Sequence, residues 1–242
     1  MEILLKTDSN KHKLRYDHHF FLAMAIILLV TFFIGFAPSY YLAGMTNAPL
    51  PDKTIHIHAI VFTIWILLYI TQVSLVFINK VNLHRQLGMI SFVFTFVMVA
   101  TGLMASVDAL KRTIAPGVDE LLFIINITMT LGFASFVAAA YKMRSTPASH
   151  KRFMLMANIA LVFAGLIRWP VDLLYHNIPL AARASYLFLL PIVLYDLWSI
   201  RKIHRVTLWS GILMIVIFEL RFFIAKTTLW LEFVERIKLH SQ

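Results

Sequence analysis

The chain has 242 residues, of which 60% are hydrophobic and only 14% are charged. A soluble globular domain is usually about 45–50% apolar and about 25% charged, so charge this sparse cannot cover a water-soluble protein of this size. The composition therefore excludes a soluble enzyme with one membrane anchor, and it excludes a disordered chain. There is no cysteine, which excludes disulfides, thiolate metal sites and covalently attached c-type haem.

Seven apolar runs follow one another along the chain, each close to the 20 residues that a helix needs to cross the hydrocarbon core. They lie at roughly 19–37, 53–78, 88–107, 120–141, 153–174, 183–199 and 207–226. The first lacks a small-residue cleavage site, so we expect an uncleaved helix rather than a signal peptide. The connections are short, so residues 1–242 are expected to form one all-α, polytopic integral membrane bundle of about seven transmembrane helices.

The last run and the tail beyond it are less regular than the others. Glu219 and Arg221 interrupt the seventh run, and if that run does not cross, the C-terminus lies inside. Residues 229–239 mix apolar and charged residues at helical spacing, which predicts a helix along the membrane interface.

The distribution of basic residues predicts the orientation. With the N-terminus inside, the inner segments hold thirteen Lys and Arg, the outer segments hold seven, and Arg168 and Arg221 lie within the runs. Cytoplasmic loops collect Lys and Arg, so the N-terminus is predicted to be inside, in a bacterial inner (cytoplasmic) membrane. The same rule accounts for the net charge of +10. No basic run is long enough for a nucleic-acid groove, so the expected partner is the lipid bilayer.

Histidines recur at the inner ends of the predicted helices. Each of three closes a short loop, precedes a basic residue and opens an inside-to-outside helix; these are His84, His150 and His204, and His18 and His19 open the first helix in the same way. A helix N-terminus and a neighbouring cation favour the neutral ring, which is the form that binds iron, copper or zinc. The alternative is that these side chains only anchor the chain among lipid headgroups.

A second polar group is expected on the outer side. It comprises His56, His58, Arg168, Asp172, Glu219 and Arg221, with His176 nearby. Charged residues inside a membrane usually face the bundle interior or a cavity, so the group predicts an outer pocket for an anionic group, a quinone or haem propionates. Arg168 and Asp172 can instead pair with each other at i and i+4.

Asp196 lies near the inner end of the sixth run, at the level of the inner histidines. A carboxylate there can orient a ligand imidazole, or it can pair with Arg201 or Lys202. Pairing with one of these two neighbours is the preferred interpretation.

Two stretches carry a resemblance to known families. They are HIHAIVFTIWILLYITQVSLVFINKVNLHRQLGMISFVFTFVMVATG at 56–102 and SHKRFMLMA at 149–157. They resemble a family of uncharacterised bacterial multi-pass membrane proteins with a His-containing helix, then Leu-His-Arg-x-Leu-Gly, then His-Lys-Arg. More distantly, His58 to Trp65 and Leu83 to Gly88 look like the two-haem transmembrane cytochromes b that carry electrons from ascorbate.

The cytochrome resemblance implies a haem site. His84 and His150 match one pair of haem ligands, and His58 matches half of the other. The partner of His58 belongs on the run 120–141, which contains no histidine. The resemblance therefore implies one b-type haem at the inner side. Separately, the outer polar group makes a quinone or another small redox molecule an expected partner.

Two other classes of function stay open. Zinc or copper bound by His84, His150 and His204 is typical of a metal-dependent membrane hydrolase, and the topology is similar to that of the adiponectin-receptor and ceramidase group. Those hydrolases carry His-x-x-x-His on the last helix, and no two histidines here have that spacing. The other class is non-catalytic, a transporter or an assembly factor of a respiratory complex.

Overall fold

The computed structural model describes the backbone of residues 2–46, 48–49, 51–111, 115, 117–175 and 177–240, and the side chains of these between 16 and 239. Every regular element within these ranges is a helix. Among the described residues, six helices are long and apolar enough to cross a membrane, namely Tyr16–Tyr41, Lys53–Phe77, Val81–Leu110, Val118–Lys142, Ile178–Ile200 and Arg205–Ile224. The predicted all-α membrane bundle is therefore confirmed, and the chain is a multi-pass membrane protein.

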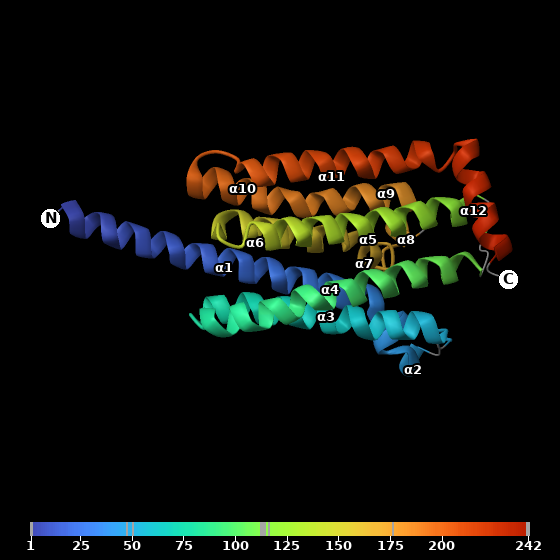
Figure 1. Ribbon diagram of the computed structural model, residues 1–242, viewed down its shortest axis with the longest axis horizontal. Coiled ribbons are helices and arrows are strands. Elements are labelled where there is room, and N and C mark those ends of the chain that lie inside the picture. Colours follow the sequence, from blue (N-terminus) through green and yellow to red (C-terminus); the bar gives the residue numbers. More distant parts are fainter. Residues whose placement is uncertain are drawn as a thin grey trace.

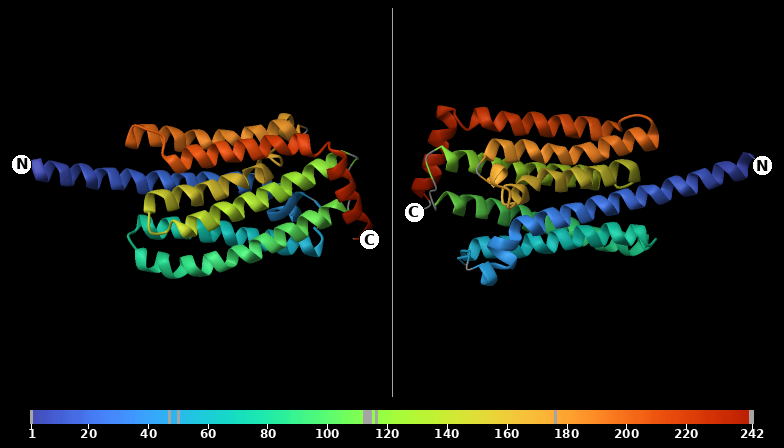
Figure 2. Two further views of the ribbon diagram at one scale, coloured as in Figure 1. Left: turned by 45° about the horizontal axis from the view of Figure 1, so that its top comes forward. Right: turned by 180° about the vertical axis from the view of Figure 1, so that it is seen from behind.

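The long helices lie side by side along one axis (Figure 1). They are α1 (Glu2–Phe36), α3 (Lys53–Phe77), α4 (Val81–Leu110), α5 (Val118–Lys142), α10 (Leu189–Ile200) and α11 (Arg205–Ile224). Helix α3 packs on α4, α4 on α5 and α5 on α6 (Pro147–Ala160), while α1 lies against α3 and α11 packs on α5 and α6. The first part of α1 projects beyond one end of the bundle (Figure 2).

Short helices complete the chain at the other end. A π-helical turn, η1 (Ala37–Tyr41), and α2 (Ala43–Thr46) follow α1, and α8 (Asp172–Tyr175), α9 (Ile178–Ala184) and the 3₁₀ turn η2 (Ser185–Phe188) precede α10. Helix α12 (Thr228–His240) lies across this end of the bundle (Figure 1). Its Trp230 indole donates to the carbonyl of Glu120 over 3.1 Å, and Lys238 pairs with the Glu120 carboxylate over 3.0 Å.

The fifth predicted helix differs from the expectation. Its segment consists of α6 and α7 (Val162–Leu166), separated at Leu161, whose amide bonds to the carbonyl of Asn158 three residues back. Helix α7 ends before Pro170 because a proline disfavours the helical conformation of the residue before it. The predicted run 153–174 therefore extends beyond the observed end of α7. Every side chain from Leu155 to Phe163 is buried, so this part of the segment lies in the core of the bundle.

Close packing fixes this interrupted segment against α1 and α3. A Cβ atom on Gly35 would lie 2.2 Å from the carbonyl oxygen of Gly165, so the two backbones touch. The Trp169 indole donates to the carbonyl of Thr31 and the Trp65 indole to the amide oxygen of Asn158, each over 3.0 Å. Indole and amide groups buried this deeply need such partners.

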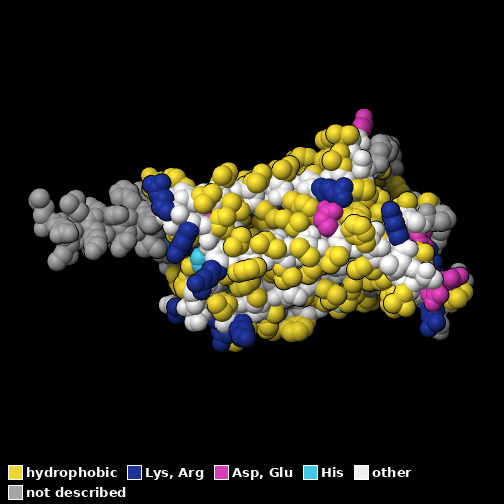
Figure 3. All heavy atoms as spheres, turned by 90° about the horizontal axis from the view of Figure 1, so that it is seen from above, with side chains coloured by type: hydrophobic (Ala, Val, Ile, Leu, Met, Phe, Trp, Pro, Cys, Tyr) yellow, Lys and Arg dark blue, Asp and Glu magenta, His cyan; other side chains and the backbone are white. Residues whose placement is uncertain are grey.

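The surface matches a lipid environment. Hydrophobic side chains cover most of the face in Figure 3, and basic side chains gather at the end from which α1 projects. Large apolar side chains such as Phe96, Leu194 and Phe223 are exposed on the long helices. Because water would penalise this much exposed apolar surface, the belt fits the hydrocarbon core of a bilayer.

Candidate functional site

His84 and His150 come together at the end of the bundle from which α1 projects. His84 lies in the first turn of α4, and His150 lies in the first turn of α6, which begins at Pro147. Proline is favoured in a first turn, where its missing amide hydrogen is not needed. The two ring centroids are 6.1 Å apart and the ring planes meet at 79°.

The main chain of α5 fixes the tautomer of His150. Its Nδ1 lies 2.9 Å from the carbonyl oxygen of Ala140, near the end of α5. A carbonyl only accepts, so Nδ1 carries the hydrogen and donates, and the lone pair of the neutral ring lies on Nε2. No hydrogen bond to this Nε2 is made within the described residues, so the nitrogen is available to a ligand.

Gln72 controls the tautomer of His84. Its main-chain oxygen lies 3.3 Å from Nδ1 of His84 and accepts a hydrogen from it. In the orientation that satisfies the Gln72 amide, its oxygen accepts from the Gly88 nitrogen and its nitrogen donates to the same Nδ1 over 2.6 Å. The first arrangement leaves the lone pair on Nε2 and the second leaves it on Nδ1. A ligand that binds Nε2 therefore selects the first.

Both histidines line a cavity of about 1260 Å³ between α1, α3, α4, α5 and α6. Aromatic side chains form much of its wall, and these are Phe21, Trp65, Tyr69, Phe92 and Tyr141. The rings of Phe92 and Tyr141 stack with centroids 3.9 Å apart. Small-molecule pockets usually measure about 300–1,000 Å³, so the volume accommodates a large planar organic cofactor.

Cations gather around the same cavity. Its lining includes Arg85, Lys142, Arg144 and Lys151. The carboxylate of Asp17, from α1, pairs with Lys151 and accepts from the Tyr195 hydroxyl. One carboxylate among four cations leaves the lining basic, which favours a ligand with acidic substituents.

The expectation that His204 joins the inner pair is wrong for the described residues. Its Nδ1 accepts from the Val206 amide over 3.1 Å and caps α11, so this nitrogen is occupied by the backbone. No group of three or more His, Cys, Asp or Glu placed to hold a metal ion occurs between the described residues. Burial and the nearby Arg152 lower the pKa of His204 from its usual 6.5, which keeps the capping nitrogen unprotonated.

Asp196 pairs with a residue that the sequence reasoning missed. Its carboxylate accepts from Arg152, from the Thr207 hydroxyl over 2.6 Å and from the His204 amide over 3.0 Å. Asp196 is 0% exposed and Arg152 is 3% exposed. The expected partners Arg201 and Lys202 are both exposed. Asp196 thus joins α6, α10 and α11 instead of orienting a histidine.

The histidines of the outer group lie on two faces of α3, as their spacing predicts. His56 Nδ1 lies 3.0 Å from the Tyr40 hydroxyl, and His58 Nδ1 lies 3.3 Å from the Thr101 hydroxyl on α4. His176 lies outside the described residues.

The charged members of the outer group separate into different contacts. Arg168 donates to the carbonyl of Ala164, and no ion pair joins it to the exposed Asp172, because α7 ends before both residues and the i, i+4 geometry is lost. Glu219 instead pairs with Arg183, which the sequence analysis did not single out. Arg221 is buried beside this pair, since the Phe222 ring lies under both the Arg183 and the Arg221 guanidinium groups.

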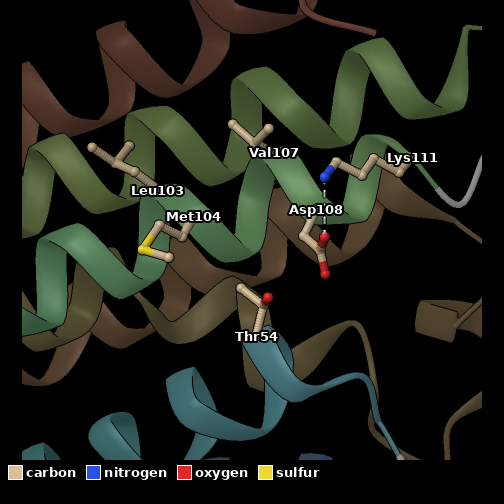
Figure 4. A pocket seen from close by; sticks show the side chains of 6 residues that line it. All are labelled: Thr54, Leu103, Met104, Val107, Asp108 and Lys111. Atoms are coloured by element: carbon tan, nitrogen blue, oxygen red, sulfur yellow. Dashed lines mark ion pairs between the residues drawn. The ribbon is translucent and has the colours of Figure 1, made fainter. Parts of the chain in front are cut away.

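A smaller hollow of about 390 Å³ lies between the start of α3 and the end of α4 (Figure 4). Its side chains are Thr54, Leu103, Met104, Val107, Asp108 and Lys111, and Lys111 pairs with Asp108 over 3.7 Å. It contains none of the predicted site residues, so the inner cavity is the better candidate.

No family model matches this chain, and searches of curated proteins and of solved structures find no match. The resemblance to cytochromes b therefore stays a prediction from the residues that carry it. The geometry of the inner cavity is the basis on which a function can be proposed.

Proposed function

We propose that the inner cavity binds one b-type haem, which His84 and His150 would hold, and that the protein transfers electrons in the membrane. The spacing of the two rings carries the proposal. Two imidazole nitrogens that each bind one metal ion at about 2.0–2.1 Å can have their ring centroids as far as about 6 Å apart. The centroids of His84 and His150 are 6.1 Å apart.

The surroundings of the two histidines support the same assignment. A ligating histidine usually donates its second ring nitrogen to a carbonyl, a carboxylate or water, and Nδ1 of each ring lies near a main-chain carbonyl. Trp65, Tyr69 and Phe92 offer apolar walls to a planar macrocycle. The cations around the cavity offer partners to two propionates.

A bound haem supplies one-electron transfer, and the chain itself positions and insulates it. Neutral rings with hydrogen on Nδ1 would present Nε2 to a bound haem, and the apolar wall would exclude water. We propose a small redox molecule such as a quinone as the donor. Since basic side chains gather at the end that holds the cavity, we also propose that this end is cytoplasmic in a bacterial inner membrane.

The absorption spectrum of the purified, dithionite-reduced protein tests the proposal. A Soret band and one haem per chain are expected, with loss of the band in His84→Ala and in His150→Ala. His56→Ala is the matched control, because this histidine lies on the outer side and should leave the spectrum unchanged. Membrane insertion of each variant is followed by immunoblot of the membrane fraction.

Other spectra would contradict the proposal in different ways. A protein without a Soret band that holds one equivalent of zinc or copper would favour the hydrolase or copper interpretation. A protein with neither cofactor would favour a transporter or an assembly factor of a respiratory complex. A full spectrum in both histidine variants would assign the haem to other ligands.

A further inference from the structure

Arg221 is a buried cation without a hydrogen-bond partner. It lies in the last turn of α11 and is 0% exposed, and its Nε, Nη1 and Nη2 make no hydrogen bond to the described residues. Arg152 is buried to a similar degree, yet it bonds to the Asp196 carboxylate and to the carbonyl of Ala148. The protein thus satisfies one buried guanidinium fully and leaves the other without an acceptor.

Three phenylalanine rings surround the Arg221 guanidinium. The distances from Cζ to the ring centroids are 4.4 Å for Phe218, 5.5 Å for Phe222 and 5.8 Å for Phe163. Such contacts attract the cation, more strongly when it is desolvated. They engage the cation through the ring faces and provide no acceptor for the five N–H hydrogens. Leaving an ionised guanidinium unpaired away from water is unfavourable, so the rings do not complete the site.

The nearest carboxylate on the same helix is engaged elsewhere. Glu219 accepts from Arg183 over 2.9 and 3.2 Å and from the Tyr186 hydroxyl over 3.1 Å. The Glu219 carboxylate attracts Arg221 through space but makes no hydrogen bond to it. One carboxylate therefore faces two guanidinium groups, Arg183 and Arg221, and leaves one positive charge unbalanced.

We propose that Arg221 is the centre of an anion-binding site inside the bundle, and that its ligand is one small monovalent anion of the chloride class. A single negative charge neutralises the guanidinium, whereas a divalent anion would leave a net charge in an apolar surrounding. The phenylalanine cage offers no hydration to an anion, which favours chloride over strongly hydrated phosphate. The guanidinium N–H groups are the donors, and the rings exclude water from the bound ion.

Anion-dependent stability of the purified protein tests this site. Because a ligand that binds only the folded state stabilises it, the thermal midpoint should rise and saturate as sodium chloride replaces sodium sulfate at constant ionic strength. Arg221→Met should abolish this rise, since methionine fills similar space without charge. Lys226→Met is the control, because Lys226 is an exposed cation just beyond the end of the same helix and its loss should leave the chloride response intact.

Two results would overturn the proposal, namely a wild-type midpoint that does not depend on chloride or an Arg221→Met variant that keeps the full response. If Arg221→Met does not fold, crystals of the wild-type protein grown in bromide decide the question. An anomalous peak within hydrogen-bond distance of the Arg221 guanidinium supports the site, and density for the guanidinium without a peak beside it refutes the site.

Discussion

Asp196→Asn removes the negative charge on which three elements of the bundle converge. The substitution keeps the size of the side chain, so its effect reports the charge and the acceptor atoms. The Arg152 guanidinium would keep the carbonyl of Ala148, 2.7 Å from Nη1, as its acceptor while staying 3% exposed. The Thr207 hydroxyl and the His204 amide both donate to Oδ2 of Asp196, so an asparagine that keeps these two bonds would turn its NH₂ group towards Arg152, which donates to Oδ1 in the wild type.

The expected loss of stability is large. Removing one partner of a buried ion pair costs about 3–5 kcal/mol because the other charge stays buried without compensation. At about 2–4 °C per kcal/mol for a chain of this size, the thermal midpoint should fall by roughly 10 °C. Arg152 is two residues after His150 on α6. We therefore also expect the Soret band of Asp196→Asn to be weaker than that of the wild type and to disappear at the same lowered temperature as the helical structure. The assay is thermal unfolding in detergent, followed by circular dichroism and by the Soret band together.

A double variant separates the charge from the packing. In Asp196→Leu with Arg152→Met both charges are absent, and replacing a buried pair by apolar residues is often neutral or stabilising. The double variant should therefore be more stable than Asp196→Asn. If Asp196→Asn melts within 2 °C of the wild type, by the conversion above, or if the double variant is the least stable, the pair does not hold these helices together.

Two further substitutions test helix contacts outside the inner cavity. His204→Ala should cost about 1 kcal/mol of unfolding free energy through loss of the α11 cap, whereas His204→Asn should retain most of it. The pKa of His204 is lower in the folded state than its usual value of 6.5, so below pH 6.5 the unfolded state binds more protons than the folded state. The free energy of unfolding of the wild type should therefore fall more steeply below this pH than that of His204→Asn. Gly35→Ala should destabilise the folded protein by about 1–3 kcal/mol, since the added Cβ would lie 2.2 Å from the Gly165 oxygen. Gly44→Ala is the control, because a Cβ there meets open space. Equal thermal midpoints for the two variants would contradict the close approach of Gly35 and Gly165.

Run length and hydropathy are sufficient to locate the bundle, because each membrane-spanning helix must satisfy its own backbone in lipid. They do not detect the interruption at Leu161, since residues 153–166 are apolar with or without a break. The early end of α7 is a local effect of Pro170. The contact between Gly35 and Gly165 is a tertiary effect, because it joins segments far apart in the sequence.

Only the part of the candidate site that depends on a local sequence pattern is predictable from the sequence. His84 and His150 share a local pattern at the start of a helix, and the fold places both on one cavity. His204 shares the same pattern, but there the ring caps its own helix, a difference that depends on backbone angles. Arg152 looked like one of several loop cations, and its partner Asp196 is 44 residues away. The available signal was Asp196 itself, because a carboxylate in an apolar run requires a buried donor.

The segment made of α6 and α7 touches both proposed sites. His150 begins it at the inner cavity, and Phe163, on the far side of the break at Leu161, contributes to the cage around Arg221. The two proposed sites place different structural requirements on this segment. The inner cavity needs a helix start held in register, which the ion pair between Arg152 and Asp196 provides. The cage needs an aromatic ring turned towards α11, and the break allows α7 to meet that requirement without changing the register of α6.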